Sequence, residues 1–210
     1  MRNYVQEGGP NFENQFLNMQ IKNKIYLEGY FQSENFFKDI GLKIREDLLI
    51  DPPNDNKNMS ALNKIKGCNS IAVHFRFFDD AIVTSNKNLQ NMTNTSIDYY
   101  KSSILKMNLF FPNAHYFIFS DQPNKVSKYL PLDHSQMTII NHNKNSNMAY
   151  ADLWLMSQCK HFIIAKSTFS WWGAWLSNNE EKIIIAPKIG NDRYTFWQNK
   201  SLIPKKWIQI

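Results

Sequence analysis

Short apolar runs alternate with longer amphipathic stretches over most of the chain. Runs of β-branched and aromatic residues predict strands at 71–75, 115–119, 137–140, 161–165 and 183–186. Patterns with a helical period predict helices at 96–110, just after Pro123, at 148–159 and at 168–177. Because an alternation of this kind specifies βαβ units, the sequence predicts an α/β fold with a Rossmann-like, doubly wound, mostly parallel sheet.

Residues 1–60 are patterned less regularly. An aromatic run at 26–31 precedes an amphipathic stretch at 33–49. The Asp-Pro-Pro-Asn-Asp-Asn segment at 51–56 predicts a loop, because proline fixes φ and the Asp and Asn side chains compete with backbone pairing. We therefore predict a partial N-terminal or linker segment of helix and loop at 1–60, followed by a Rossmann-like domain at 61–210.

The composition is that of an ordinary globular protein, with 43% hydrophobic and 20% charged residues among 210. The formal net charge of +6 suits an anionic ligand, but the basic residues are scattered and no nucleic-acid-binding signature accompanies them. We therefore expect no nucleic-acid partner. Cys68 and Cys159 lack metal-ligand spacing, so we expect free buried thiols.

The sequence contains neither the apolar segment of a signal peptide nor the run of roughly 18 apolar residues that is needed to cross a bilayer. We expect a soluble protein of the cytoplasm. Peripheral association with the inner membrane of a bacterium, or a place in the Golgi lumen of a eukaryote, stays open, as does the oligomeric state.

His74, Arg76 and Asp79 form the first candidate group. His74 and Arg76 are two residues apart on a predicted strand and therefore project from the same face, while Asp79 follows the end of that strand. An arginine fork there could neutralise a diphosphate and stabilise the charge that develops on a leaving nucleotide. An ion pair between arginine and aspartate would produce the same pattern, and the spacing alone does not choose between them.

A second group, Ser120 and Asp121, ends the next predicted strand. Asp121 could orient Arg76 or a substrate. Both residue types are also good helix N-caps, and Pro123 opens a short helix two residues later. The local pattern by itself favours the capping role.

The segment 152–175 predicts a helix, a buried strand and a Ser/Thr-rich turn that opens another helix. Free backbone N–H groups and the positive end of the helix dipole, with the hydroxyls of Ser167 and Thr168, would form a phosphate cradle. In the alternative, Ser167 only caps the helix and the tryptophans fill the core. The residues leave both readings open.

Ordered strings within these groups resemble glycosyltransferase family 11, the α-1,2-fucosyltransferases. Leu-Met-Ser-Gln-Cys-Lys-His at 155–161 and Ser-Thr-Phe-Ser-Trp-Trp-Gly-Ala at 167–174 resemble the family's hallmark segment. His74-Phe75-Arg76 with Asp79 resembles its His-x-Arg-Arg-x-Asp motif, and Phe119-Ser120-Asp121 resembles its strand-end motif. Segments 26–36 and 203–207 are also similar to the family pattern, so the resemblance covers nearly the whole chain.

The resemblance implies the C-terminal, donor-binding half of a GT-B-like fold, with a partial N-terminal segment. It also implies a galactoside α-1,2-fucosyltransferase, which moves L-fucose with inversion from GDP-β-L-fucose to the 2-hydroxyl of a galactose-containing glycan or surface polysaccharide. No metal and no further cofactor are expected.

Residue roles follow from the same motifs as what the resemblance implies. Arg76 would contact the diphosphate, His74 and Asp152 would contact guanine, and Asp79 would be the catalytic base beside Arg76. The full set expected to bind the donor consists of His74, Arg76, Asp121, Asp152, Lys166, Ser167, Thr168, Phe169 and Ser170.

The chain also departs from the family pattern. Phe77 and Phe78 replace the second arginine and the glycine of the first motif, and Lys166 replaces an asparagine before the Ser-Thr pair. The family's Gly-Gly-Leu-Gly-Asn-Gln strand and turn is absent from the sequence. An inactive or fragmentary GDP-fucose-binding domain is therefore the alternative to an active transferase.

Overall fold

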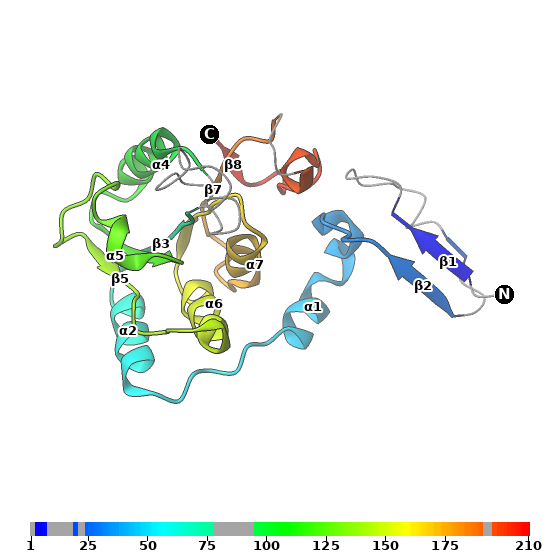
Figure 1. Ribbon diagram of the computed structural model, residues 1–210, viewed down its shortest axis with the longest axis horizontal. Helices are drawn as coiled ribbons and strands as arrows, with labels where there is room; N and C mark the ends of the chain where they lie inside the picture. The colour runs from blue at the N-terminus through cyan, green and yellow to red at the C-terminus, as the bar shows by residue number, and fades with distance from the viewer. Residues whose placement is uncertain (1–2, 8–18, 21–23, 78–94, 191–194) are drawn as a thin grey trace, which may run out of the picture. The chain divides into compact units, whose positions relative to one another are not determined.

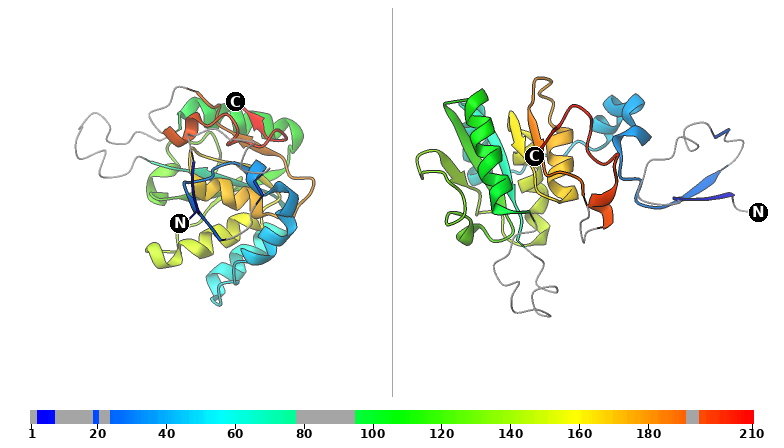
Figure 2. Two further views of the ribbon diagram at one scale, coloured as in Figure 1. Left: turned by 90° about the vertical axis from the view of Figure 1, so that its right-hand side faces the viewer. Right: turned by 90° about the horizontal axis from the view of Figure 1, so that it is seen from above.

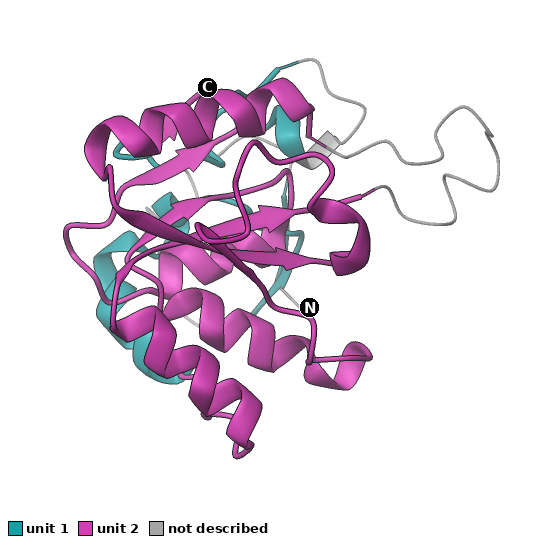
Figure 3. Cartoon of the chain, turned by 90° about the vertical axis from the view of Figure 1, so that its left-hand side faces the viewer, with its two compact units in different colours: residues 1–48, 188–207 teal, residues 49–187, 208–210 magenta. Residues whose placement is uncertain are grey.

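A computed structural model describes residues 3–7, 19–20, 24–77, 95–190 and 195–210. The chain forms two compact units, one of residues 1–48 with 188–207 and one of residues 49–187 with 208–210 (Figure 3). The limits of these units differ from the predicted ranges of 1–60 and 61–210. The division of the chain into two folding domains at those ranges stays a prediction.

The second unit is built on a six-stranded parallel sheet with the order β5-β4-β3-β6-β7-β8. Its strands are β3 (Asn69–Phe75), β4 (Ala114–Ser120), β5 (Met137–Ile139), β6 (His161–Ile163), β7 (Ile184–Ala186) and β8 (Ile208–Gln209). In chain order this is 3-2-1-4-5-6, the order of dinucleotide-binding sheets, so the Rossmann-like fold is confirmed. The strand order reverses between β3 and β6.

Helices cover both faces of this sheet. Helix α4 (Ile97–Phe110) packs on one face, while α2 (Asn56–Lys66), α6 (Ala149–Ser157) and α7 (Thr168–Leu176) lie on the other (Figures 1 and 2). The short α5 (Pro123–Val126) follows β4. A Cβ atom on Gly173 of α7 would lie 2.5 Å from the Met156 sulfur of α6, so glycine allows these two helices to pack closely.

Successive side chains of β3 point to opposite faces of the sheet, so one set enters the hydrophobic core and the other faces α7. Ile71, Val73 and Phe75 are fully buried and belong to the hydrophobic cluster that includes α4. The Phe75 ring stacks on Tyr100 of α4 with ring centroids 4.4 Å apart. Each buried apolar side chain of this size stabilises the fold by about 1.5–3 kcal/mol. Side chains alternate along a strand, so His74 projects toward the face covered by α7.

Helix α2, strand β8 and a 3-10 helix at Ser146–Met148 were not predicted from the sequence. Helix α2 begins at the last residue of the predicted loop, with the Asp55 carboxylate accepting hydrogen bonds from the backbone N–H groups of Lys57 and Asn58. Strand β8 pairs with β7 at the edge of the sheet. Cys68 and Cys159 are free thiols, as predicted; Cys159 is buried and Cys68 is partly exposed.

The first unit contains a parallel pair of strands, β1 (Asn3–Gln6) and β2 (Ile25–Glu28). Two 3-10 helices (Glu34–Phe36 and Lys38–Ile40), α1 (Gly41–Asp47) and a third 3-10 helix (Thr195–Gln198) complete its regular elements in the described residues. The expectation of helix and loop alone at 1–60 missed both strands. The Ser33 hydroxyl donates to the Ser201 carbonyl at 2.9 Å, which ties the two segments of this unit together.

Over the ranges that the structure describes, no helix has both the length and the apolar character required to cross a membrane.

Candidate functional site

An open cavity of about 890 Å³ lies in the second unit, where β3, β4 and β5 end. Its lining consists of Lys57, His74, Arg76, Phe119, Ser120, Asp121, Pro123, Asn124, residues 140–146, Ala149, Asp152 and Phe169. In sheets of this kind, ligands bind outside the carboxyl ends of the strands and beside the point where the strand order reverses. The cavity therefore occupies the expected place for a ligand.

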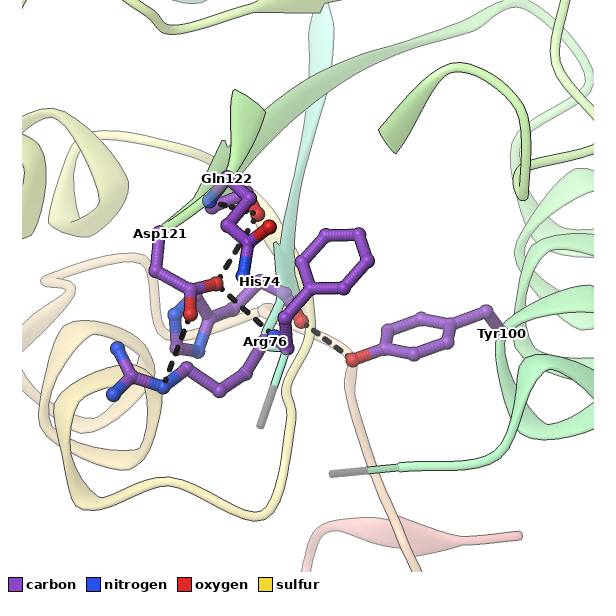
Figure 4. A network of polar contacts seen from close by, with 7 residues as sticks. His74, Arg76, Tyr100, Asp121 and Gln122 are labelled. Carbon is purple, nitrogen blue, oxygen red and sulfur yellow. Dashed lines mark hydrogen bonds and ion pairs between the residues drawn. The ribbon is translucent and has the colours of Figure 1, made fainter. Parts of the chain in front are cut away.

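Arg76 and Asp121 meet at this edge because of the sheet register. Phe75 is the partner of Ser120 in the β3–β4 pairing, so the residues that follow them lie side by side. The Arg76 Nε lies 3.6 Å from the Asp121 Oδ2, and the Asp121 Oδ1 accepts the Phe77 N–H at 3.0 Å (Figure 4). The capping reading of Asp121 is not what forms, because the N-cap of α5 is Gln122 and has no side-chain capping bond.

The electrostatics of this pair favour an oriented guanidinium. Burial raises the pKa of Asp121, whereas the Phe77 N–H and the charge of Arg76 act in the opposite direction. The Arg76 side chain is 35% exposed and lines the cavity, while its Nε edge faces Asp121. A guanidinium held in this way has a fixed geometry, which suits recognition of phosphate oxygens.

His74 is a buried, neutral imidazole in the wall of the cavity. It is only 5% exposed, and its ring centroid lies 5.5 Å from that of Phe169 in α7. Burial, with a smaller contribution from the charge of Arg76, lowers the pKa of His74 to about 3. Its buried Nδ1 has no hydrogen-bond partner in the described part of the chain. Buried polar atoms are normally paired, so this nitrogen is a candidate for contact with a ligand.

The backbone at His74 is held from the opposite side of the sheet. The hydroxyl of Tyr100, in α4, donates to the His74 carbonyl at 3.0 Å (Figure 4). This bond fixes the end of β3 and with it the positions of the His74 and Arg76 side chains.

Asp152 supplies a carboxylate from the first turn of α6. Its Oδ1 accepts a hydrogen bond of 2.8 Å from the Asn143 side-chain amide. Burial raises the pKa of Asp152 to about 6, and the bond from Asn143 partly opposes this shift. At neutral pH the group is therefore mostly a carboxylate, which can accept two hydrogen bonds side by side.

The start of α7, where a phosphate cradle was predicted, contributes one of its predicted residues to the lining of the cavity. Phe169 lines it, whereas Lys166, Ser167, Thr168 and Ser170 are not among its lining residues. Ser167 is the N-cap of α7 but makes no side-chain capping bond, and Thr168 is exposed. The phosphate-binding role of Ser167 and Thr168 stays a prediction.

Ser170 and Lys166 have contacts within the chain. Ser170 is fully buried, and its hydroxyl accepts the Ala165 N–H at 3.3 Å and donates to the Ser167 carbonyl at 3.2 Å. These bonds stabilise the turn between β6 and α7. The Lys166 backbone N–H donates to the Thr95 hydroxyl at 3.1 Å.

Asp79, expected as the catalytic base, and Phe78 lie outside the described residues. Phe77 stands where the family motif has its second arginine, and its side chain is buried in the core. Its ring packs on Phe75 and Tyr129, with centroids 5.2 and 5.8 Å apart. The side chain at this position therefore packs in the core and does not line the cavity.

Sequence reasoning missed the polar loop after β5. Asn141, His142, Asn143 and Lys144 all line the cavity, as does Lys57 from α2. The signal was present, because these residues follow an apolar strand in the same way as Arg76 and Ser120 do. Within the described ranges, no group of three or more His, Cys, Asp and Glu side chains is placed to hold a metal ion.

Comparison with known proteins gives two relatives and one family. The family model described as Glycosyl transferase family 11 matches residues 3–210. The chain is 33% identical over 195 residues to the Alpha-1,2-colitosyltransferase of Escherichia coli, covering 92% of this chain and 65% of that protein. It is 30% identical over 208 residues to the O-antigen biosynthesis glycosyltransferase WbnK of Escherichia coli, covering 93% of this chain and 65% of that protein. The chain thus spans about two thirds of the length of these relatives.

Proposed function

Because the chain belongs to glycosyl transferase family 11, we propose that it binds GDP-β-L-fucose and transfers L-fucose to the 2-hydroxyl of a galactoside in a surface polysaccharide or other glycan. One observation carries this proposal. The cavity at the carboxyl edge of the sheet brings together an oriented guanidinium, a buried neutral imidazole and a carboxylate. We propose that the reaction needs no metal ion.

The diphosphate of the donor is assigned to Arg76. Its guanidinium is a permanent cation beside the topological switch point of the sheet, where phosphates bind in related folds. As the bond to the sugar breaks, negative charge increases on the departing GDP. A preorganised cation that contacts this group stabilises the transition state more than the ground state.

The guanine base is assigned to Asp152 and His74. One carboxylate can accept both the N1–H and the 2-amino group of guanine, whereas adenine presents no such pair of donors. A neutral imidazole in the wall of the same cavity can form a hydrogen bond to the nucleoside without adding charge. Together these contacts would select GDP over ADP or UDP.

The proposed transfer is a single in-line displacement. The oxygen of the acceptor 2-hydroxyl attacks the anomeric carbon of fucose, and a new C–O bond forms on the face opposite to GDP. The bond between the anomeric carbon and the phosphate oxygen breaks, and its electron pair leaves with GDP. The hydroxyl proton passes to a base, for which Asp79 is the proposed residue, so a β-linked donor gives an α-linked product.

The names of the relatives refine the range of substrates to be tested. One is named for transfer of colitose with an α-1,2 linkage, and the other for O-antigen biosynthesis. Colitose in place of fucose, and an O-antigen precursor as acceptor, are therefore included in our proposal. Phe77 stands where the family motif has its second arginine, and its ring is buried in the core, so a protein that binds the donor without transfer is the second candidate.

Incubation with GDP-L-fucose and lactose tests transfer directly. We expect 2′-fucosyllactose and GDP as products, and we expect Arg76→Ala to lower turnover at least about tenfold, or roughly 1.4 kcal/mol. Lys101→Ala is the matched control, because Lys101 is an exposed cation on α4, 53% exposed, and does not line the cavity.

Two other outcomes separate the candidates. Thermal stabilisation of the protein by GDP, with no transfer of fucose from GDP-L-fucose or of colitose from GDP-colitose to lactose or to O-antigen precursors, would favour the second candidate. A folded sample that neither binds GDP nor forms product would rule out both.

A further inference from the structure

A closed set of hydrogen bonds connects α2 to Asp152 through the loop after β5. Asn58, in the first turn of α2, is fully buried. Its amide nitrogen donates to the Asp55 carboxylate at 2.6 Å and to the Asn143 side-chain oxygen at 2.8 Å. Its oxygen accepts from the Asn143 amide at 2.9 Å and lies 3.0 Å from the His142 Nε2. The Asn143 amide then reaches Asp152.

These contacts use all the hydrogen-bonding capacity of Asn58. A primary amide has two N–H donors and one oxygen with two lone pairs, and here each has a partner. The Asp55 carboxylate can only accept, so the nitrogen of Asn58 must face it and the oxygen must face His142 and Asn143. The orientation of Asn58 therefore determines the orientation of Asn143.

The Asn58 and Asn143 side-chain amides link the Asp55 carboxylate to the Asp152 carboxylate, and Asp55 determines which way both amides are oriented. Because the Asn58 oxygen accepts from Asn143, the nitrogen of Asn143 points toward both Asn58 and Asp152. Asn143 cannot rotate its amide without losing two bonds to Asn58 at once. It consequently presents a donor, and not an acceptor, to the Asp152 Oδ1.

We propose that Asn143, locked by Asn58, is a positioning residue that aims the Asp152 carboxylate at the nucleotide base and thereby sets base selectivity. This inference rests on the proposed function, in which Asp152 accepts from guanine. Asn143 touches neither phosphate nor sugar in this scheme and acts through Asp152.

Asn143 acts by fixing the orientation of the Asp152 carboxylate. A carboxylate that must accept two neighbouring donors of guanine has to hold both oxygens in the plane of the base. In the described part of the chain, the bond from Asn143 is the one that fixes rotation of Asp152, and the Oδ1 retains a second lone pair for the base. A donor at this position also favours the carboxylate over the carboxylic acid. Without it, Asp152 would be free to turn.

The discriminating variant is Asn143→Asp, which keeps the size of the side chain and replaces the donor by an acceptor. Asn63→Asp is its control, since it makes the same substitution and adds the same charge at an exposed position of α2 that does not line the cavity. The dissociation constants of GDP and ADP are measured at about pH 8, where Asp152 is ionised.

We expect the wild-type protein and Asn63→Asp to prefer GDP over ADP by the same factor. Asn143→Asp should lower that preference about tenfold, which is within the discrimination that one bidentate contact to a base edge supplies. A general loss of fold or of phosphate affinity would weaken the binding of GDP and of ADP equally and leave the ratio of their dissociation constants unchanged. Should Asn143→Asp not fold, Asn143→Ala removes the donor without adding charge and is measured in the same way.

The outcomes separate the inference from the function on which it rests. An unchanged GDP:ADP ratio in a folded Asn143 variant, with a clear GDP preference in the wild type, overturns the positioning role alone. A wild-type protein that binds GDP and ADP equally overturns the guanine assignment of Asp152 together with the positioning role.

Discussion

Arg76 and Phe77 are neighbours in sequence but differ in environment. Side chains alternate across a strand, so Arg76 shares the face of His74 and lines the cavity, whereas Phe77 shares the face of Phe75 and is buried in the core. A second cation at position 77 would therefore need a different local backbone to reach the same ligand. The single guanidinium, oriented by Asp121, is the strand-end cation on which donor binding depends in our proposal.

Asp152 gives a pH dependence at the residue scale. Its pKa is about 6 because burial disfavours the charged form, and the contact to guanine that we propose requires the carboxylate. As the pH falls through this value, the form that accepts hydrogen bonds is lost. The apparent dissociation constant of GDP-L-fucose should therefore rise about tenfold between about pH 7 and about pH 5. Isothermal titration calorimetry over this range would measure it.

The choice of ligand and a variant isolate the group responsible. GDP-L-fucose carries its phosphates without a terminal titrating oxygen, so the ligand does not change charge near neutral pH. Asp152→Asn should bind more weakly and show a flat profile. A slope of equal size in Asp152→Asn would assign the titration to another group, such as Asp121, whose pKa is also raised by burial.

Some site residues could be predicted from sequence and others could not. His74, Arg76 and Asp121 were predictable because strand ends in a parallel sheet meet at one edge. Ser170 was expected to bind the donor, but it is not among the lining residues of the cavity, and only the shape of the turn shows that its hydroxyl bonds to the backbone. Asn143 was missed because asparagine is common along this chain, and its role depends on Asn58, 85 residues away.

Among the elements, α4 has a polar contact with the sheet that can be tested. The buried Tyr99 hydroxyl donates to the carbonyls of Ile164 and Ile185, at 2.7 and 3.0 Å. These carbonyls follow β6 and lie within β7, so the hydroxyl joins α4 to two strands beyond the point where the strand order reverses. Tyr99→Phe would remove this one donor, although the Ile185 carbonyl would still accept from the Ile164 N–H at 3.0 Å. The variant should lower the free energy of unfolding by about 1–3 kcal/mol, mainly through the loss at the Ile164 carbonyl.

Chemical denaturation of Tyr99→Phe and of a control measures this effect. Tyr150→Phe removes a hydroxyl of the same kind from a side chain that is 44% exposed, and its stability should stay within about 0.5 kcal/mol of the wild type. Equal stability of Tyr99→Phe and the wild type would contradict a structural role for the bond.

Long helices and strands were predicted from the sequence more accurately than short ones. Helix α4 was found within one residue of its predicted limits, because fourteen residues carry a strong periodic signal. Strand β8 has two residues and β1 has four, which is too short for a pattern to stand out. Helix α2 was missed because its first turn is polar and continues the polar composition of the predicted loop. The N-cap at Asp55 therefore did not stand out as the start of a helix.

At the scale of the whole molecule, the site belongs to one unit. Every described residue that lines the cavity lies between residues 49 and 187, within the second compact unit. The six strands and their helices provide the switch point, the end of β3 and the loop after β5 without a residue of the first unit. The nucleotide binding that we propose for this cavity therefore needs no side chain of the first unit among the described lining residues.

Hydrogen exchange measured with and without GDP tests this division. Protection should increase at 74–76, 119–124 and 140–152, because binding restricts local opening in the segments that line the cavity. Residues 24–48, in the first unit, should exchange at unchanged rates. At a GDP concentration of about one hundred times the dissociation constant, the second unit should gain about 2.7 kcal/mol of stability. Protection that appeared at 24–48 and not around the cavity would place the nucleotide elsewhere, because a ligand slows exchange in the segments that it holds.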